Sequence, residues 1–280
     1  MRCPTLAELP PPPPGKTGWP WTEESEQLTD EMPVQSSRAW PKISIGYPNL
    51  EYMVIDGGSD DGSVEIIKKY EPWLAYWVSE PDRGQSHAIN KGFDRATGDV
   101  YAWLNSDDYY APEAFSKVAR AFVENETHWV AGITAKVDAD GEIFQVSKKP
   151  DEKLEIWYIG GRYQQQGIFW RRELWERAGG LDESFQYCFD YDLWMKFIQV
   201  QPFATWIDDA LAYFRIHSES KTSQDQLKFM KERHRIYRKA DLKSMDLSSR
   251  FYIWKGRRER RSRIYLHSTL SDETLHPAKK

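Results

Sequence analysis

Two adjacent carboxylates, Asp107 and Asp108, follow a short apolar segment and are well placed to do chemistry. The segment, residues 100–104, is predicted to be a strand, and ligands in open α/β sheets bind at the carboxyl ends of strands. Like charges side by side repel, so such a pair is usually balanced by a cation. Mg²⁺ takes oxygen ligands and is typically held by one or two carboxylates plus substrate phosphates. The alternative is an acidic turn before a helix near residues 111–113, where Pro112 suits the first helical position.

The elements that must position these carboxylates alternate along the first half of the chain. Short apolar segments predict strands over 42–45, 52–55, 75–78 and 100–104, and helices are predicted over 64–70, 86–96 and 113–125. This alternation predicts a mostly parallel sheet with helices on its faces. Further strands are predicted over 129–137, 142–147 and 210–216, and further helices over 172–178, 192–199 and 223–240.

Composition limits the class of protein. A chain of 280 residues that is 40% hydrophobic can bury one sizeable core, and two full domains are not expected. Its net charge of -5 argues against nucleic-acid binding, which needs a strongly basic face. Two cysteines, Cys3 and Cys188, do not make a disulfide framework and fit a reducing compartment. Because no apolar run approaches the roughly 18 residues of a membrane span and no signal peptide is visible, we expect a cytoplasmic protein.

Three regions are predicted along the chain. Residues 1–40 are expected to be a disordered leader, with a polyproline run over residues 10–14. The α/β domain is expected over 41–222, and a helical, basic extension over 223–280. The basic residues of the extension are Lys255, Arg257, Arg258, Arg260, Arg261 and Arg263. One interpretation is a solvated helix face, and the other is peripheral contact with an anionic membrane surface.

Seven segments with polar residues follow one another along the chain: YMVIDGGS (52–59), SEPDRGQ (79–85), AINKG (88–92), WLNSDD (103–108), GGLDE (179–183), FDYDLW (189–194) and YFRIH (213–217). Taken in this order, they resemble family 2 glycosyltransferases, the nucleotide-sugar-dependent enzymes with a GT-A fold. The likeness spans residues 41–222, and it depends on the order and spacing of the segments. It implies a GT-A-like α/β fold and inverting transfer of a sugar from a nucleoside-diphosphate donor to a glycan or lipid-linked hydroxyl acceptor.

The resemblance implies donor-binding roles for several polar residues. Asp56 closes the second strand, where family members contact the nucleobase or ribose, and a carboxylate accepts hydrogen bonds from such groups. Asp82, Arg83 and Asn90 resemble the loop and helix of the donor pocket. The planar donor fork of Arg83 suits a phosphate or a sugar. The alternatives are a turn-forming role for Asp56 and a surface ion pair between Arg83 and Asp82.

The resemblance also implies a divalent metal, Mn²⁺ or Mg²⁺. Residues 105–107 look like the family's Asp-x-Asp motif with its first Asp replaced by Asn105, which offers a carbonyl oxygen without charge. Metal ligation is therefore assigned chiefly to Asp107, with Asp108 in support, and the metal would neutralise the leaving diphosphate. His217 resembles a late histidine near the metal in some members. A histidine after a strand is otherwise a plain surface residue.

Asp190 occupies the position of the family's general base, ahead of a helix. An inverting transfer needs a carboxylate to take the proton of the acceptor hydroxyl as its oxygen attacks the anomeric carbon. Asp192 is the competing candidate, and a helix-capping role is an alternative for both residues.

The chain departs from the family near its first strand. Only residues 46–51 separate the predicted strands 42–45 and 52–55, whereas a crossover between neighbouring parallel strands needs a dozen or more residues. Either residues 42–45 are not the family's first strand, or the first strand–helix unit is incomplete. This departure supports an alternative function, a catalytically inactive binding or scaffold protein. A nucleotidyltransferase is a further alternative, but no Gly-rich basic phosphate loop is visible near the first strand.

Overall fold

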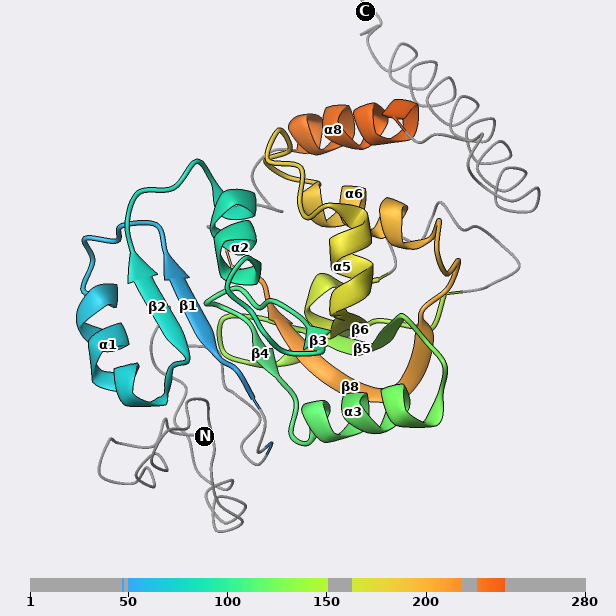
Figure 1. Cartoon of the computed structure of the whole chain (residues 1–280), viewed down its shortest axis with the longest axis horizontal. Coiled ribbons are helices and arrows are strands. Elements are labelled where there is room, and N and C mark those ends of the chain that lie inside the picture. Colours follow the sequence, from blue (N-terminus) through green and yellow to red (C-terminus); the bar gives the residue numbers. More distant parts are fainter. Residues whose placement is uncertain (1–46, 48–49, 151–162, 218–225, 240–280) are drawn as a thin grey trace, which may run out of the picture.

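The computed structural model describes residues 47, 50–150, 163–217 and 226–239 (Figure 1). The helical elements are α1 (Ser63–Tyr70), η3 (Glu71–Trp73), α2 (Gln85–Phe93), α3 (Ala114–Glu124), η5 (Gln165–Gly167), α5 (Arg172–Ala178), α6 (Phe189–Phe197) and α8 (Gln226–Lys239). The strands are β1 (Met53–Asp56), β2 (Tyr76–Ser79), β3 (Val100–Tyr101), β4 (Tyr109–Tyr110), β5 (Trp129–Val137), β6 (Ile143–Val146), β7 (Ile168–Arg171) and β8 (Thr205–Arg215). The predicted leader, the predicted strand over 42–45 and the basic residues 255–263 lie outside the described residues.

The first unit of the fold is a parallel β1–α1–β2 arrangement. The strands pair from Met53 with Tyr76 to Asp56 with Ser79, so the carboxyl ends of both strands lie side by side. Between them, α1 has an acidic residue in its first turn and two lysines in its last, which complements the helix dipole. The α2 helix packs on β1, where Gly92 lies close to the Ile55 side chain. This unit places Asp56 at an exposed sheet edge.

The larger sheet has the strand order β3-β7-β5-β8-β4, with β6 on the free part of β5. The long β5 strand is apolar and almost entirely buried, as expected of a central strand. It runs parallel to β8 and antiparallel to β6 and β7. The sheet positions two loops of interest, residues 102–108 after β3 and the end of β8 beyond Phe214.

The prediction of a mostly parallel sheet was wrong in this detail. Of the six described strand pairings, β1–β2 and β5–β8 are parallel and the other four are antiparallel. Short connections explain part of the difference, because β5 and β6 are joined by a tight turn and such turns join only antiparallel strands. The predicted strand over 100–104 also ends early, at Tyr101, since its pairing with β7 covers only Val100 and Tyr101.

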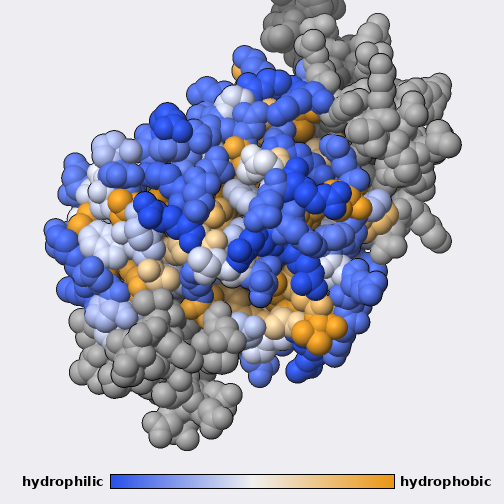
Figure 2. All heavy atoms as spheres, in the orientation of Figure 1, coloured by the Kyte–Doolittle hydropathy of each residue, from blue (hydrophilic) through white to orange (hydrophobic). Residues whose placement is uncertain are grey.

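Helices cover both faces of the larger sheet (Figure 1). On one face, α3 buries the stripe Ala114, Val118, Ala121 and Phe122, at the spacing of one helix side. On the other face, α5 and α6 enclose a core rich in tryptophan, and Trp129, Trp170 and Trp194 are at most 1% exposed. The aromatic excess of the sequence is therefore largely core. The outer surface is mostly hydrophilic in the view of Figure 2, with apolar residues in scattered patches.

The two sheets remain separate in the part of the chain that the structure describes. There, β1 pairs only with β2, and β3 pairs only with β7. Glu51 joins them instead: its carboxylate accepts hydrogen bonds from the Thr97 backbone N–H at 2.7 Å and the Thr97 hydroxyl at 2.8 Å, just ahead of β3. Among these residues, no helix is both long and apolar enough to cross a bilayer.

Candidate functional site

Asp56 sits at the end of β1 and organises the turn that follows. Its carboxylate accepts hydrogen bonds from the backbone N–H groups of Gly58 and Ser59 and from the hydroxyls of Ser59 and Ser79, at 2.5–3.0 Å. Burial alone would raise the pKa of Asp56, but these hydrogen bonds outweigh it and hold the pKa below its ordinary value. Asp56 is thus an ionised, turn-forming carboxylate, and its contact with a nucleotide stays a prediction.

The loop after β2 lies against the end of β1. A Cβ atom added to Gly57 would lie 2.7 Å from Oδ2 of Asp82, so this backbone approaches the carboxylate closely. Asp82 also accepts a hydrogen bond from the Gly84 N–H at 2.7 Å. Arg83 does not form the ion pair with Asp82 that the sequence offered as an alternative. It pairs with Glu183, with Nη2 2.7 Å from Oε2, and 68% of its side chain is exposed.

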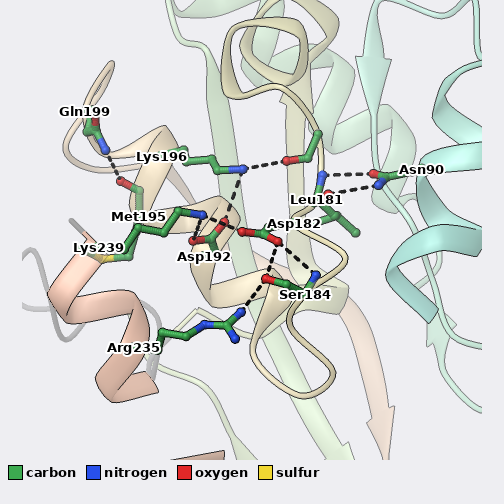
Figure 3. Close-up of polar contacts among 11 residues, drawn as sticks. Asn90, Leu181, Asp182, Ser184, Asp192, Met195, Lys196, Gln199, Arg235 and Lys239 are labelled. Carbon is green, nitrogen blue, oxygen red and sulfur yellow. Dashed lines mark hydrogen bonds and ion pairs between the residues drawn. The ribbon is translucent and has the colours of Figure 1, made fainter. Parts of the chain in front are cut away.

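Asn90 links α2 to the segment before α6. Its amide donates to the Leu181 carbonyl oxygen and accepts from the Leu181 N–H, both at 3.0 Å (Figure 3). Its Nδ2 also lies 3.3 Å from Oε1 of Glu183. The predicted donor-pocket residue is therefore a structural link in this structure, and it brings segment 179–183 beside α2.

The loop after β3, residues 102–108, contains the adjacent carboxylates Asp107 and Asp108. Asn105 accepts a hydrogen bond from Nε2 of Gln85 at 2.6 Å and donates to Asp108 at 3.2 Å. Asp108 is 1% exposed, and its oxygens also accept from Gln166 Nε2 at 2.8 Å and from the Arg215 N–H at 3.0 Å. Burial, followed by the nearby charge of Asp107, raises the pKa of Asp108 to about 7. Asp108 therefore anchors the loop to η5 and β8, and its supporting metal role stays a prediction.

Asp107 and His217 face each other from two different elements. Nε2 of His217 lies 3.1 Å from Oδ2 of Asp107, and their side chains are 28% and 29% exposed. A carboxylate and an imidazole suit Mn²⁺, and a hard divalent ion commonly completes its shell with phosphate oxygens and water. Across the described ranges, no group of three or more His, Cys, Asp or Glu side chains is arranged to hold a metal ion. The chemistry of Asp107 and His217 suits a divalent metal, and their role as ligands stays a prediction.

Asp190 and Asp192 occupy the first turn of α6 in contrasting surroundings. Asp190 is partly exposed, and its Oδ1 accepts a hydrogen bond from the Tyr191 N–H at 2.7 Å. Burial is the main influence on the pKa of Asp190, and the net effect raises it to about 6. Asp192 is 4% exposed. Its Oδ2 lies 3.3 Å from Nζ of Lys196, and its Oδ1 lies 3.5 Å from Nζ of Lys239. Asp192 therefore forms ion pairs with two lysines, which favours Asp190 over Asp192 for the predicted role of base, and that role stays a prediction.

The loop at residues 82–85 is the common neighbour of these groups. It contacts the end of β1 through Asp82 and the loop over residues 102–108 through the Gln85–Asn105 hydrogen bond. It reaches the segment before α6 twice, through Arg83 and Glu183 and where Gly84 approaches the Gln186 amide. The turn after Asp56, the loop that contains Asp107 and the segment before Asp190 thus all border one short segment.

Sequence reasoning missed several residues of this arrangement. Gln85 and Glu183 fall within the quoted segments 79–85 and 179–183, which was an available signal. Arg215 likewise falls within the quoted segment 213–217. Gln166 and Glu232 had no such signal as contacts of the site, because their partners are far away in the sequence.

Comparison with known proteins identifies relatives of this chain. The sequence model for glycosyl transferase family 2 matches residues 35–180, just over half of the chain. An uncharacterized glycosyltransferase of Rickettsia typhi is 26% identical over 189 residues, covering 63% of this chain and 58% of that protein. Hyaluronan synthase of Pasteurella multocida is 26% identical over 194 residues, covering 66% of this chain and 19% of that protein. The chain spans less than two thirds of the length of these relatives.

Solved structures show the same fold at low sequence identity. TarS from S. aureus, residues 1–349 in complex with UDP-GlcNAc, has a TM-score of 0.57 at 17% identity, over 72% of this chain and 61% of that one. A mannosyltransferase from Pyrobaculum calidifontis in complex with GDP-Man and Mn²⁺ has a TM-score of 0.50 at 19% identity, over 68% and 55%. The predicted GT-A-like α/β fold is confirmed.

Proposed function

Because this chain belongs to glycosyl transferase family 2, we propose that it transfers a sugar from a nucleoside-diphosphate donor to a hydroxyl acceptor. The observation that most supports this activity is that residues 82–85 contact the segments next to Asp56, Asp107 and Asp190. Structural neighbours in complex with UDP-GlcNAc, and with GDP-Man and Mn²⁺, support the class of donor.

In this proposal the donor nucleotide binds where β1 and β2 end. Asp56 remains ionised, so its oxygens can accept hydrogen bonds from nucleobase N–H or ribose hydroxyl groups. Asp82 and Asn90 hold the surrounding loops through their backbone contacts. Arg83 is largely exposed, so its guanidinium can exchange Glu183 for a diphosphate oxygen without desolvating a buried group.

Asp107 and His217 are the residues proposed to hold Mn²⁺ or Mg²⁺ together with the donor diphosphate. When bound, the metal would supply positive charge that stabilises the departing nucleoside diphosphate. Asn105 and Asp108 hold the loop in place through Gln85, Gln166 and the backbone of β8.

Asp190 is proposed as the general base of an inverting transfer. Its carboxylate takes the proton of the acceptor hydroxyl while the oxygen attacks the anomeric carbon on the side opposite the diphosphate. A pKa of about 6 leaves Asp190 ionised at neutral pH and makes it a stronger base than an ordinary aspartate. Its partial exposure lets an acceptor reach it.

The acceptor is proposed to be a glycan or a lipid-linked hydroxyl compound in polysaccharide assembly. The six basic residues from Lys255 to Arg263 support a cytoplasmic location with peripheral contact to an anionic membrane.

The division into a leader, a transferase domain over 41–222 and a helical extension from 223 remains part of the same proposal.

The test is release of nucleoside diphosphate from a panel of UDP-, GDP- and dTDP-sugars with simple sugar acceptors and Mn²⁺. We expect turnover that EDTA abolishes and that Asp107→Ala lowers by about 100-fold, the scale of losing electrostatic stabilisation of a leaving group. Asp140→Ala is the matched control, because Asp140 is an exposed acid in the turn between β5 and β6. Equal turnover by wild type and Asp107→Ala would overturn the metal role.

An inactive binding or scaffold protein is the second candidate, favoured by the lack of a described pairing between β1 and β3. Calorimetry with UDP, GDP and dTDP, with and without Mn²⁺, separates the two candidates. A transferase requires metal-dependent binding of one nucleotide, whereas a scaffold that has lost the pocket binds none.

A further inference from the structure

The carboxylate of Glu232 accepts three backbone hydrogen bonds at the start of α6. Its Oε1 accepts from the Gln186 N–H, and its Oε2 accepts from the N–H groups of Tyr187 and Cys188, each at 2.9 Å. These donors lie immediately before the first residue of α6, where the helix dipole favours a negative charge. A carboxylate that accepts backbone N–H groups forms strong, geometrically defined hydrogen bonds.

The rest of α8 is docked along the same segment. Nζ of Lys239 lies 2.6 Å from Oδ2 of Asp182 (Figure 3). Nη2 of Arg235 donates a hydrogen bond to the Ser184 hydroxyl oxygen at 2.5 Å. The Arg235 guanidinium also stacks over the Phe185 ring at 3.8 Å, and Ile236 is 1% exposed. Because helix and segment are joined at several points, Glu232 has a fixed place against residues 186–188.

Asp190 follows directly after the residues that Glu232 holds. The segment between Gln186 and Asp190 has no regular structure before Phe189, so its path depends on external hydrogen bonds. We propose that Glu232 is a positioning residue for the transfer reaction: by fixing the backbone of residues 186–188, it aims the Asp190 carboxylate at the acceptor hydroxyl. This inference rests on the proposed function. It assigns a role to α8, which lies outside the residues 35–180 that the family model matches.

The groups around Asp190 shift its pKa in opposite directions, and two of them come from α8. Burial is the largest influence on the pKa of Asp190 and raises it, while the N–H groups of Tyr191 and Asp190 lower it. From α8, Arg233 lowers this pKa and Glu232 raises it. Removing the Glu232 charge would therefore lower the pKa of Asp190.

The test compares Glu232→Ala and Glu232→Gln with wild type, using the donor that turns over in the panel. We expect Glu232→Ala to lower kcat by about 10- to 100-fold, the cost of misplacing a catalytic group, with donor KM changed less than about threefold. Glu232→Gln keeps one oxygen acceptor and should recover part of kcat. In both variants the acid side of the pH–kcat profile should move to lower pH. The control is Lys231→Ala, an exposed neighbour on α8, which should match wild type.

The kinetics of these variants separate this inference from its alternatives. Wild-type kcat and an unmoved pH profile in both Glu232 variants would overturn it, and so would lower kcat with an unmoved profile, which is a merely structural effect. If a thermal unfolding assay shows that Glu232→Ala does not fold, the nearly isosteric Glu232→Gln variant replaces it. Its kcat and its pH–kcat profile then decide whether the inference holds. Full activity of Asp190→Asn would instead overturn the proposed base itself.

Discussion

Asp190 and Asp192 show how two residues of one type, two positions apart, acquire different chemistry. Asp192 is buried between two lysines, and its charge is balanced by them. Asp190 has backbone N–H donors and the opposing charges of Glu232 and Arg233 nearby. The motif register favoured Asp190, but only the surrounding side chains explain why Asp192 is unsuited to accept a proton.

The raised pKa of Asp190 predicts the pH dependence of the reaction. The base must be ionised, so kcat should fall about tenfold per pH unit below the pKa of about 6 and level off above it. A pH–kcat profile between pH 4.5 and 8.5, with saturating donor and acceptor, measures this directly. A profile that stays flat through pH 5 would contradict the assignment of Asp190 as the base.

The loop over residues 102–108 shows which features of a site can be predicted from sequence and which cannot. Its position after a strand indicated a ligand-binding edge, and Asp107 does face His217, more than 100 residues away. The burial of Asp108 was not predictable, because Gln166 and Arg215 approach it only after the larger sheet has formed.

At the scale of elements, the contact between β5 and β8 holds the larger sheet together. Gly132 lies where the strands approach closely, and an added Cβ would fall 2.5 Å from Leu211 Cδ1 and 3.1 Å from the Ile207 carbonyl oxygen. Leu211 is fully buried and has no room to move away. The absence of a side chain at this position therefore determines how closely β8 can pack.

We predict that Gly132→Ala destabilises the protein by about 1–3 kcal/mol, the usual cost of overpacking a core. Chemical denaturation followed by tryptophan fluorescence measures the change, since the buried tryptophans are in the same core. Gly98→Ala is the matched control, because its added Cβ would make only ordinary contacts, at 3.6 Å or more. Equal free energies of unfolding for Gly132→Ala and wild type would show that the strands can separate without cost.

Most elements follow from local sequence, and the exceptions have tertiary causes. The helices predicted over 64–70, 113–125 and 172–178 appear as α1, α3 and α5, within one residue at each end. The α6 helix begins three residues before its predicted start, at Phe189, so it includes Asp190. Strand β8 begins at Thr205 rather than at 210, because pairing with β5 continues through irregular register shifts.

At the scale of the whole molecule, two separate sheets are brought together by loops and by α2. The alternation of strands and helices predicted the β1–α1–β2 unit correctly, whereas the direction of pairing in the larger sheet depends on contacts between distant strands. The short connection over residues 46–51 raised the question of an incomplete first unit. The described residues of β1 and β3 do not pair, and residues 42–45 lie outside the described ranges.

The proposal that these separate segments form one transferase site is most directly tested by the activity of Asp190→Asn. The measurement is steady-state release of nucleoside diphosphate with Mn²⁺, donor and acceptor, accompanied by calorimetric binding of the same nucleotide. We predict that Asp190→Asn binds nucleotide as wild type does, while kcat falls by about 100- to 10,000-fold, the range for losing a general base. Wild-type turnover in Asp190→Asn would contradict this account.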